Sequence, residues 1–425
     1  MKHTLMRLSR VAIVLCISAL FLSCRSLPLP RTPTPSATAA ITATSTGSPE
    51  IKPSATAIPS PTDTSTATAT ATASPTALPP TATSTATLTE TPSPTPSASP
   101  SPTATHTETP EQTATPSPVP TLTTEEQAQA LANQVSAERL MDDVRWLADG
   151  ERRGRLAGSK DEDAAGEWLV QWFQTLALEP FRELGLDDYY MHFEVPGVTR
   201  YGRCGPGATC PAENVVAVLP GTTLPESYVA ISAHYDHLGV RFDGQVYNGA
   251  DDDATGVAAV LETARILSTS GLRPKESIVF LCFSAEEIGL LGSLAACDRI
   301  GANALNGRVA VLNMEVLGAV KGKGTYLDVW DEGVAMTEPL VTALFHAGGW
   351  LDVPLKRQGR DPGSDAVRLV TCGVPAVTVD VAWSRENHPH YHQPSDDPEH
   401  IDVDGFTDAV RVTVAALWML ANDGQ

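Results

Sequence analysis

The chain has 425 residues and a formal net charge of −21 at pH 7. Beyond the first few residues no cluster of Lys and Arg offsets this charge, which argues against nucleic acid as a partner, because a phosphate backbone requires such a cluster. The acidic balance otherwise indicates solubility rather than a particular fold.

Residues 1–24 predict a lipoprotein-type signal peptide. A basic stretch precedes an apolar run that is too short to predict a membrane span. The run ends at Cys24 in a pattern that resembles a bacterial lipobox. We therefore expect an extracytoplasmic, cell-surface protein that is anchored to the membrane through a lipid on Cys24. Plain secretion and an uncleaved anchor are the alternatives.

Residues 25–122 form a tract rich in Pro, Thr, Ser and Ala. The tract has few large apolar side chains, so it cannot bury enough surface to offset the conformational entropy of folding. Its repeated Pro-Thr and Pro-Ser steps favour extended, polyproline-like conformations. We predict a disordered linker that acts as a stalk or as an inert spacer.

Residues 123–425 are predicted to form the folded domain. Thr123 and Glu126 give a capping-box pattern at the start of a first helix, and further helices are expected after Ser136 and Ser159. Strands and helices then alternate, and several strands are near-continuous apolar runs, as expected when both faces are buried. This pattern predicts an α/β fold: a single domain with a mostly parallel, mixed central sheet flanked by helices.

The boundaries expected for these later elements follow from the same patterns. The predicted strands are Tyr189–Val195, Asn214–Leu219, Tyr228–His234, Ser277–Ser284, Arg308–Glu315, Thr325–Trp330 and Pro375–Val381. The predicted helices are Thr255–Ser268, Leu290–Ile300, Glu338–Ala347 and Gly405–Asn422.

The cysteines allow one disulfide prediction. Cys204 and Cys210 lie in one Gly/Pro-rich loop, where an exported protein would close a small disulfide. Cys282 lies inside an apolar strand and is expected to be a buried thiol. The sequence leaves the state of Cys297 and Cys372 open.

Acidic residues and histidines follow several of the predicted strands. They are His234, Glu286, Glu287 and Glu315 at strand ends, with Asp252 and His392 in two loops. Ligands of open α/β sheets bind at the carboxyl ends of strands. A buried, unpaired carboxylate is costly, so several acids and imidazoles that converge on one edge predict a cation. Mixed histidine and carboxylate ligands fit zinc, with cobalt or manganese as alternatives.

Seven segments carry a specific pattern: Gly154–Ser159, Asn214–Val216, Ala233–Gly239, Gly249–Gly256, Ala285–Ser293, Asn313–Glu315 and Tyr391–Asp396. Together they resemble the zinc aminopeptidases of the M28 type, also called the aminopeptidase Y or glutamate carboxypeptidase superfamily. The resemblance extends from about Arg153 to the C-terminus. It implies a zinc exopeptidase fold.

The same resemblance implies a site for two zinc ions. His234 and Glu315 would hold one ion, Glu287 and His392 would hold the other, and Asp252 would bridge both. By the family pattern, the peptide bond that follows this aspartate would be cis. The family pattern gives no ligand role to His237, His388 or His390.

The resemblance also implies a hydrolytic mechanism. A water molecule bridged by the two zinc ions would attack the scissile carbonyl, with Glu286 as general base. Tyr391 would donate a hydrogen bond to the oxyanion, and Asp236 would fix the imidazole of His234. Asp251 and Asp253 are expected to shape their loop, whereas Asp396 is expected to orient the loop of His392.

The expected function is a zinc-dependent exopeptidase, foremost an aminopeptidase, that acts as a monomer on peptides or small proteins. A carboxypeptidase or dipeptidase and a glutaminyl cyclase of the same superfamily are the enzymatic alternatives. A non-catalytic binding module and a surface adhesin are the others. The chain departs from the family in one place: many members have Ser-Asp-His where this chain has Ser364-Asp365-Ala366, which leaves the substrate pocket open to question.

Overall fold

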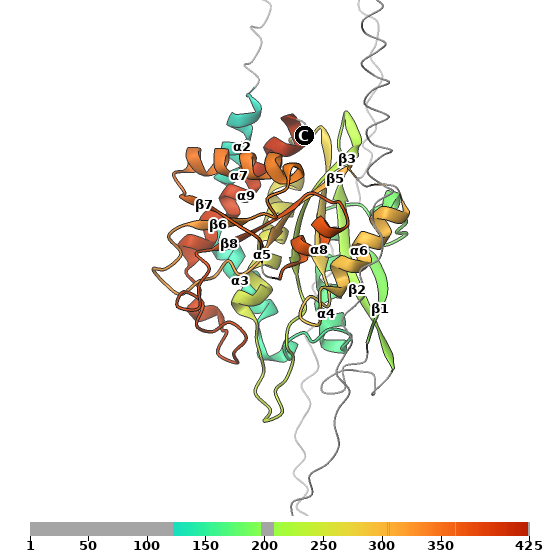
Figure 1. The fold of residues 1–425 in the computed structure, drawn as a ribbon, viewed down its shortest axis with the longest axis vertical. Helices are drawn as coiled ribbons and strands as arrows, with labels where there is room; N and C mark the ends of the chain where they lie inside the picture. Colours follow the sequence, from blue (N-terminus) through green and yellow to red (C-terminus); the bar gives the residue numbers. More distant parts are fainter. Residues whose placement is uncertain (1–121, 197–207, 304, 306, 362, 424–425) are drawn as a thin grey trace, which may run out of the picture. The chain divides into compact units, whose positions relative to one another are not determined.

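The computed structural model describes residues 122–196, 208–303, 305, 307–361 and 363–423. The predicted signal peptide and the predicted linker up to residue 121 lie outside this part of the chain. Figure 1 shows a twisted sheet with helices packed on both of its faces. This arrangement confirms the predicted α/β domain with a mixed central sheet.

The sheet has eight strands in the order β1-β2-β4-β3-β5-β8-β6-β7. The strands are β1 (Tyr190–Pro196), β2 (Thr209–Leu219), β3 (Leu224–His234), β4 (Glu276–Phe283), β5 (Val309–Met314), β6 (Leu327–Trp330), β7 (Leu355–Gln358) and β8 (Ala376–Val381). The four neighbours β4, β3, β5 and β8 run parallel to one another. Antiparallel pairs flank this centre, because β2 pairs with both β1 and β4, and β6 pairs with β8.

The helices of the described residues largely follow the predicted boundaries. They are α2 (Thr124–Ala132), α3 (Ala137–Leu147), α4 (Lys160–Thr175), α5 (Thr255–Thr269), α6 (Leu291–Ala302), α7 (Glu338–Leu351), α8 (Asp365–Thr371) and α9 (Val403–Asp423). The predicted N-caps of the first three are confirmed, since Thr123, Ser136 and Ser159 each accept a backbone hydrogen bond through their side chains. Thr123 and Glu126 also complete the capping box.

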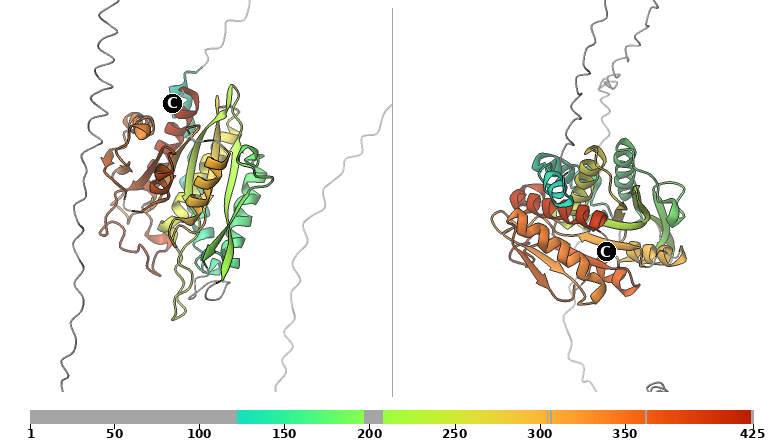
Figure 2. Two further views of the ribbon diagram at one scale, coloured as in Figure 1. Left: turned by 45° about the vertical axis from the view of Figure 1, so that its right-hand side comes forward. Right: turned by 90° about the horizontal axis from the view of Figure 1, so that it is seen from above.

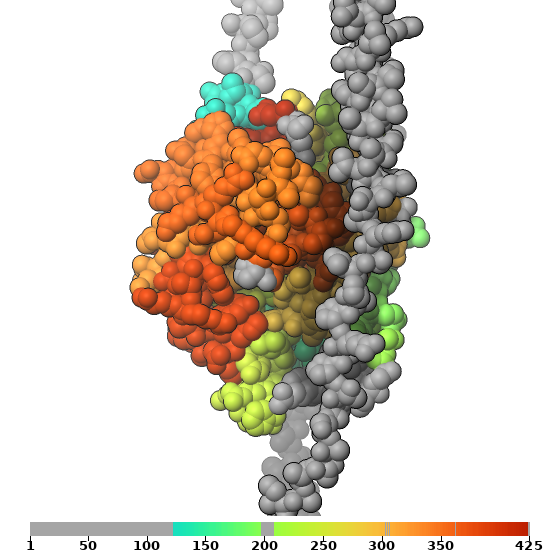
Figure 3. All heavy atoms as spheres, viewed as in Figure 1, coloured from blue at the N-terminus to red at the C-terminus, as the bar shows by residue number. Residues whose placement is uncertain are grey.

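Alternate residues of the central strands face two different cores, as the pleat of a strand requires. Val229 and Ile231 of β3 belong to a core that also contains residues of α5 and α9. Tyr228 and Ala230 of the same strand face a second core, with residues of α6 and α8. The sheet is therefore buried on both faces, and Figure 2 shows it between helices from two directions. The chain from α7 onward, orange to red, forms much of the left side of the face in Figure 3.

Two elements lie outside the predicted set. β7 is a short strand that includes the exposed Lys356 and Arg357, so it lacks the apolar run used to predict strands. α8 spans seven residues, too few for a helical repeat of apolar positions to become visible. The segment between them contributes Asp361 and Gly363 to the cavity described below.

The structure shows the bonding state of the cysteines that lie in the described residues. Cys297 of α6 and Cys372, which follows α8, form a disulfide, which settles the pair that the sequence leaves open. Cys282 is a buried free thiol, as predicted. Cys210 is disulfide-bonded, whereas its predicted partner, Cys204, lies outside the described residues. Among the helices of the described part, none combines the length and apolarity needed to cross a bilayer.

Candidate metal centre

Three adjacent strands bring predicted ligands to one edge of the sheet. β3 ends at His234, the turn 284–287 follows β4, and Glu315 follows β5. Because β3 runs parallel to both β4 and β5, the carboxyl ends of all three lie at the same edge. Asp252 lies in the loop between β3 and α5, and His392 lies in the loop that follows β8.

The carboxylate of Asp252 lies at the centre of this group. Its Oδ1 is 3.1 Å from Nε2 of His234, and its Oδ2 is 3.0 Å from Nε2 of His392. The same nitrogen of His392 is 3.2 Å from Oε2 of Glu287. Burial alone would raise the pKa of Asp252, but its short contacts with the two imidazoles hold this pKa well below its usual range. Four of the five predicted ligands therefore converge.

Glu315, the fifth predicted ligand, is buried beside this group. Its Oε2 accepts a hydrogen bond of 3.2 Å from Nδ2 of Asn313. Among the described contacts, none within ion-pair distance joins Glu315 to His234, the residue with which it was predicted to share an ion. Burial raises the pKa of Glu315 well above its usual range, and the charge of Glu286 adds to this effect while His234 opposes it. Glu315 therefore belongs to the same electrostatic cluster.

His237 is the residue that the sequence analysis missed. Its side chain is fully buried, and its Nδ1 lies 2.7 Å from Oε1 of Glu287 and 3.8 Å from Oδ2 of Asp252. Ligand atoms of His237, Asp252 and Glu287 all lie within 4.8 Å of one another. One feature of the sequence could have indicated His237 as a ligand: it lies in the turn directly after β3, three residues beyond His234. The family pattern gives this position no ligand role, so His237 was not included.

Asp236 and Glu286 lie at the border of the cluster. The Asp236 carboxylate accepts hydrogen bonds from the backbone N–H groups of Glu286 at 3.0 Å and Glu287 at 3.3 Å. It thereby positions the turn that carries both glutamates. The contact of Asp236 with His234 is made mainly through its backbone carbonyl, 3.1 Å from Nδ1, because the carboxylate is 3.6 Å away. Oε2 of Glu286 lies 3.9 Å from Nε2 of His234.

The loop that contains Asp252 is held by its neighbours in the sequence. Asp253 accepts hydrogen bonds from the backbone of His234 and from the backbone of Gly256 at the start of α5. Asp251 accepts one from the backbone of Gly318 at 2.6 Å. Both aspartates therefore shape the loop, as predicted, rather than extending the ligand set. The peptide bond between Asp252 and Asp253 is cis, as the resemblance implied.

Asp396 links this loop to the loop of His392. Its two carboxylate oxygens accept hydrogen bonds from the backbone N–H groups of Asp251 at 2.9 Å and Asp252 at 3.1 Å. His388 reinforces the link, because its Nδ1 lies 2.6 Å from Oδ2 of Asp251 and its Nε2 lies 2.7 Å from the carbonyl of Val381. With both ring nitrogens engaged in this way, His388 has a structural role.

Arg155 supports the cluster from behind. The residue is fully buried, and its guanidinium donates hydrogen bonds of 2.7–3.0 Å to the backbone carbonyls of Leu147, Tyr235, Asn248 and Gly249. These carbonyls belong to α3, to the turn after β3 and to the start of the Asp252 loop. One side chain therefore fixes three segments around the site, which gives a physical reason for an arginine within the segment Gly154–Ser159.

The donor set fits a divalent metal ion. Several buried atoms that could ligate a metal have no hydrogen-bond partner: both ring nitrogens of His237, Oδ2 of Asp252 and Oε1 of Glu287. Leaving such atoms without partners costs free energy, and a cation shared among them would remove this cost. Imidazole and carboxylate ligands suit zinc and related divalent ions. His234, Asp252, Glu287 and His392, with His237 and Glu315 beside them, would hold the metal.

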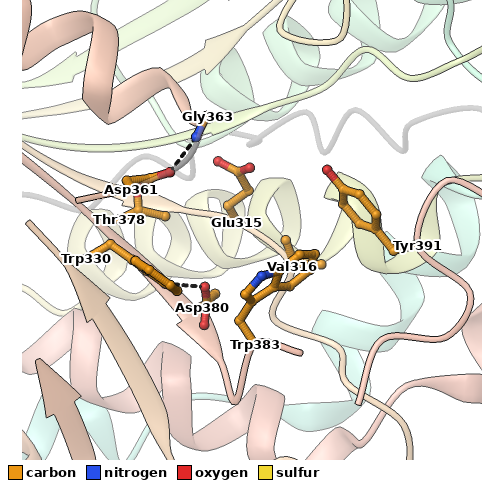
Figure 4. A pocket seen from close by; sticks show the side chains of 9 residues that line it. All are labelled: Glu315, Val316, Trp330, Asp361, Gly363, Thr378, Asp380, Trp383 and Tyr391. Atoms are coloured by element: carbon orange, nitrogen blue, oxygen red, sulfur yellow. Dashed lines mark hydrogen bonds between the residues drawn. The ribbon is translucent and has the colours of Figure 1, made fainter. Parts of the chain in front are cut away.

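A cavity opens next to Glu315, and its walls come from β6, β8 and the segments that follow β5, β7 and β8. The residues that line it are Glu315, Val316, Trp330, Asp361, Gly363, Thr378, Asp380, Trp383 and Tyr391 (Figure 4). Tyr391 also stacks on His392, with ring centroids 4.0 Å apart. The cavity is therefore continuous with the candidate metal centre through Glu315 and Tyr391.

A mixed α/β sheet with buried histidines and carboxylates at its carboxyl edge has the arrangement of a metalloenzyme centre. The family model described as Peptidase family M28 matches residues 214–417, which include most of the sheet and all of the predicted ligands. Residues 214–417 of the chain are thus similar to the metallopeptidases of family M28.

Curated relatives are similar over part of the chain. A probable zinc metalloprotease of Pyrenophora teres f. teres (strain 0-1) is 28% identical over 323 residues, which cover 70% of this chain and 67% of that protein. Aminopeptidase YwaD of Bacillus subtilis (strain 168) is 26% identical over 224 residues, which cover 49% of this chain and 44% of that protein. The matches to three further probable zinc metalloproteases span 50–55% of their lengths, so the chain covers only about half of several relatives.

Solved structures share the fold at low identity. A zinc aminopeptidase of Bacillus subtilis matches with a TM-score of 0.56 and 16% identity, over 68% of this chain and 96% of that chain. A glutaminyl cyclase of Fimbriiglobus ruber matches with a TM-score of 0.54 and 20% identity, over 67% of this chain and 96% of that chain. At these identities the likeness concerns the fold, and the fold alone does not separate the two activities.

Proposed function

We propose that this protein is a zinc-dependent exopeptidase, and specifically an aminopeptidase, with Glu286 as its general base. The observation that carries the proposal is the position of Glu286 beside the candidate metal ligands. Its Oε2 lies 3.9 Å from Nε2 of His234, and its backbone N–H donates a hydrogen bond to Asp236. A base must lie within reach of the water or group that it deprotonates, and a carboxylate at the border of a metal cluster meets this requirement.

Two zinc ions bound by the cluster would lower the pKa of an attacking water and polarise the scissile carbonyl. Glu286 would accept the proton of that water and pass it to the leaving amine. Burial raises the pKa of the Glu286 carboxyl, with further contributions from Asp365 and Glu287 against the opposing effect of His234, and a raised pKa suits a group that must both accept and release a proton. Tyr391 would donate a hydrogen bond to the oxyanion.

The charge of the cavity disfavours a substrate that presents a C-terminal carboxylate beside the metal centre. Among the described residues that line it, three are acids and none is Lys or Arg. A carboxypeptidase needs a cationic partner for the C-terminal carboxylate of its substrate. The curated relative named an aminopeptidase supports the same direction. The signal-like segment that ends at Cys24 supports, as part of this proposal, action on peptides outside the cytoplasm by an enzyme tethered to a membrane.

A glutaminyl cyclase is the second candidate, because a solved cyclase shares the fold. The two activities differ in their products. An aminopeptidase releases the N-terminal residue, whereas a cyclase converts an N-terminal glutamine to a ring and releases ammonia.

The test is hydrolysis of aminoacyl p-nitroanilides beside their N-acetylated forms, after chelation and again after zinc is restored. We expect zinc-dependent cleavage of the free-amine substrates alone. Glu286→Gln should bind zinc with unchanged stoichiometry and retain no more than a few per cent of the activity, because only the base is removed. Cleavage of acetylated substrates, or ammonia release from glutaminyl peptides without hydrolysis, would replace the aminopeptidase assignment. A fully active Glu286→Gln variant would refute the role of the base.

A further inference from the structure

The cavity beside Glu315 is lined by the polar faces of two strands. In β8, Val377, Val379 and Val381 face the main core, whereas Thr378 and Asp380 lie on the opposite face and line the cavity. In β6, Leu327 and Val329 face the same core, and Trp330 lines the cavity. Because side chains alternate along a strand, this pattern directs the polar residues of both strands into one space.

Two buried aspartates lie in this space and are absent from the predicted metal site. Asp361 is 7% exposed and Asp380 is 5% exposed. Asp361 accepts hydrogen bonds from the backbone of Gly363 at 2.9 Å and from the hydroxyl of Ser364 at 2.5 Å. With Glu315 these residues bring three carboxylates to the cavity, and no lysine or arginine is among the described residues that line it.

Asp380 has an oxygen without a partner. Its Oδ2 accepts a hydrogen bond of 2.5 Å from the indole Nε1 of Trp330, whereas its buried Oδ1 has no hydrogen-bond partner. Burial, followed by the charge of Asp328, raises the pKa of Asp380 well above its usual range. A buried carboxylate oxygen without a donor costs free energy, and a cationic ligand in the cavity would remove this cost.

Aromatic rings form the other walls. Figure 4 shows the hydrogen-bonded pair Trp330–Asp380 and Asp361 on one side of the cavity, with Tyr391 on the other. Trp383 packs edge-on against Tyr391, with ring centroids 5.0 Å apart. Indole and phenol faces accommodate alkyl chains and attract cations. Aromatic walls with carboxylates between them suit an alkyl ammonium better than an uncharged aliphatic side chain.

We propose that this cavity binds the side chain of a basic N-terminal residue, with lysine preferred, through its ammonium and the carboxylates of Asp380 and Asp361. The proposal rests on the proposed aminopeptidase function, because it places the residue before the scissile bond next to the metal centre. The cavity volume is about 60 Å³. At roughly 10–15 Å³ for each water-sized group, this volume suits the narrow side chain of lysine better than the larger guanidinium of arginine.

The experiment compares lysyl and norleucyl p-nitroanilides, whose side chains have similar alkyl lengths and differ in charge. For the zinc-loaded full chain we expect kcat/KM for the lysyl substrate to be higher by about tenfold or more, as expected for one charge-assisted contact. Asp380→Asn should lower the lysine-to-norleucine ratio by a similar factor, because asparagine can still accept the Trp330 hydrogen bond but has no charge. Asp361→Asn should lower it as well. Asp142→Asn, at an exposed position of α3, should leave the ratio unchanged.

Calorimetric binding of free L-lysine and L-norleucine provides a second readout that needs no turnover. Tighter binding of L-lysine, lost in Asp380→Asn, supports the inference. Zinc-dependent cleavage with no preference for lysine overturns the inference but leaves the proposed function intact. If neither substrate is cleaved, the proposed function fails, and calorimetry still decides on the cavity: equal binding of the two amino acids overturns the inference.

Discussion

Nδ1 of His237 lies 2.7 Å from Oε1 of Glu287, and neither atom has a hydrogen bond of suitable geometry. Two buried ligand atoms this close, without a hydrogen bond of suitable geometry between them, are arranged as partners of a common cation. We predict that His237→Ala lowers the affinity for zinc by about 10–100-fold, the range typical of residues that hold or orient a ligand. Competition with a chromophoric chelator measures this affinity.

The control for this prediction is His390→Ala. His390 lies in the loop of His392, but its Nδ1 pairs with the hydroxyl of Ser395 at 2.9 Å and its ring stacks on His400. Zinc affinity of this variant should match that of the unmodified protein. Equal zinc affinity of His237→Ala and His390→Ala would mean that His237 only packs beside the cluster.

Arg155 leads to a prediction about stability. Arg155→Met leaves the four backbone carbonyls that Arg155 bonds without these donors, in a site from which water is excluded. We expect the free energy of unfolding of the metal-free protein to fall by at least about 3 kcal/mol. Urea denaturation measures this change. Arg153→Met is the matched control, because Arg153 has a side chain that is 55% exposed and makes only a surface contact of 3.5 Å with Asp161, so a change within about 0.5 kcal/mol is expected.

Much of the fold was predictable because its signals are local. The capping residues Thr123, Ser136 and Ser159 and the apolar runs of the central strands each fix one element without reference to the rest of the chain. β7 and α8 were missed because the first is short and charged and the second is too short to show a repeat. Their positions depend on contacts with β6 and α6 that no local pattern reports.

The candidate site likewise combines residues that local patterns predict with contacts that only the folded structure shows. His234, Glu287 and Glu315 could be predicted because each follows a strand whose end is visible in the sequence. The contact between His237 and Glu287 could not, since it depends on how two turns at neighbouring strand ends face each other. The cavity acids were missed for a related reason. Asp380 occupies a polar position inside a largely apolar strand, and only the strand order shows that it lies close to Trp330.

The disulfide between Cys297 and Cys372 leads to a third prediction. It closes a loop of 75 residues and joins α6 to the end of α8. The chain-entropy relation gives about 4 kcal/mol of stabilisation for a loop of this size. Replacement of both cysteines by serine should lower the free energy of unfolding by about this amount under oxidising conditions. Cys282→Ala, which removes a buried free thiol, should cost much less. A double variant as stable as the unmodified protein would show that the bond does not form in solution.

His388 provides a pH-dependent prediction. Burial opposes its charge, but Asp251 at 2.6 Å raises the pKa of His388 to about 9. A histidine with a raised folded-state pKa stabilises the fold fully below its unfolded pKa of about 6.5, and this stabilisation is lost as the pH rises through the folded value. His388→Gln should therefore be less stable than the unmodified protein near pH 6, by up to about 3 kcal/mol. The difference should shrink steadily between about pH 6.5 and 9, because the unmodified protein loses the charged pair while the variant has none to lose. Urea denaturation of both proteins in the same metal state at several pH values measures this trend, and a difference that stays constant from pH 6 to pH 9.5 would show that His388 is neutral in the fold.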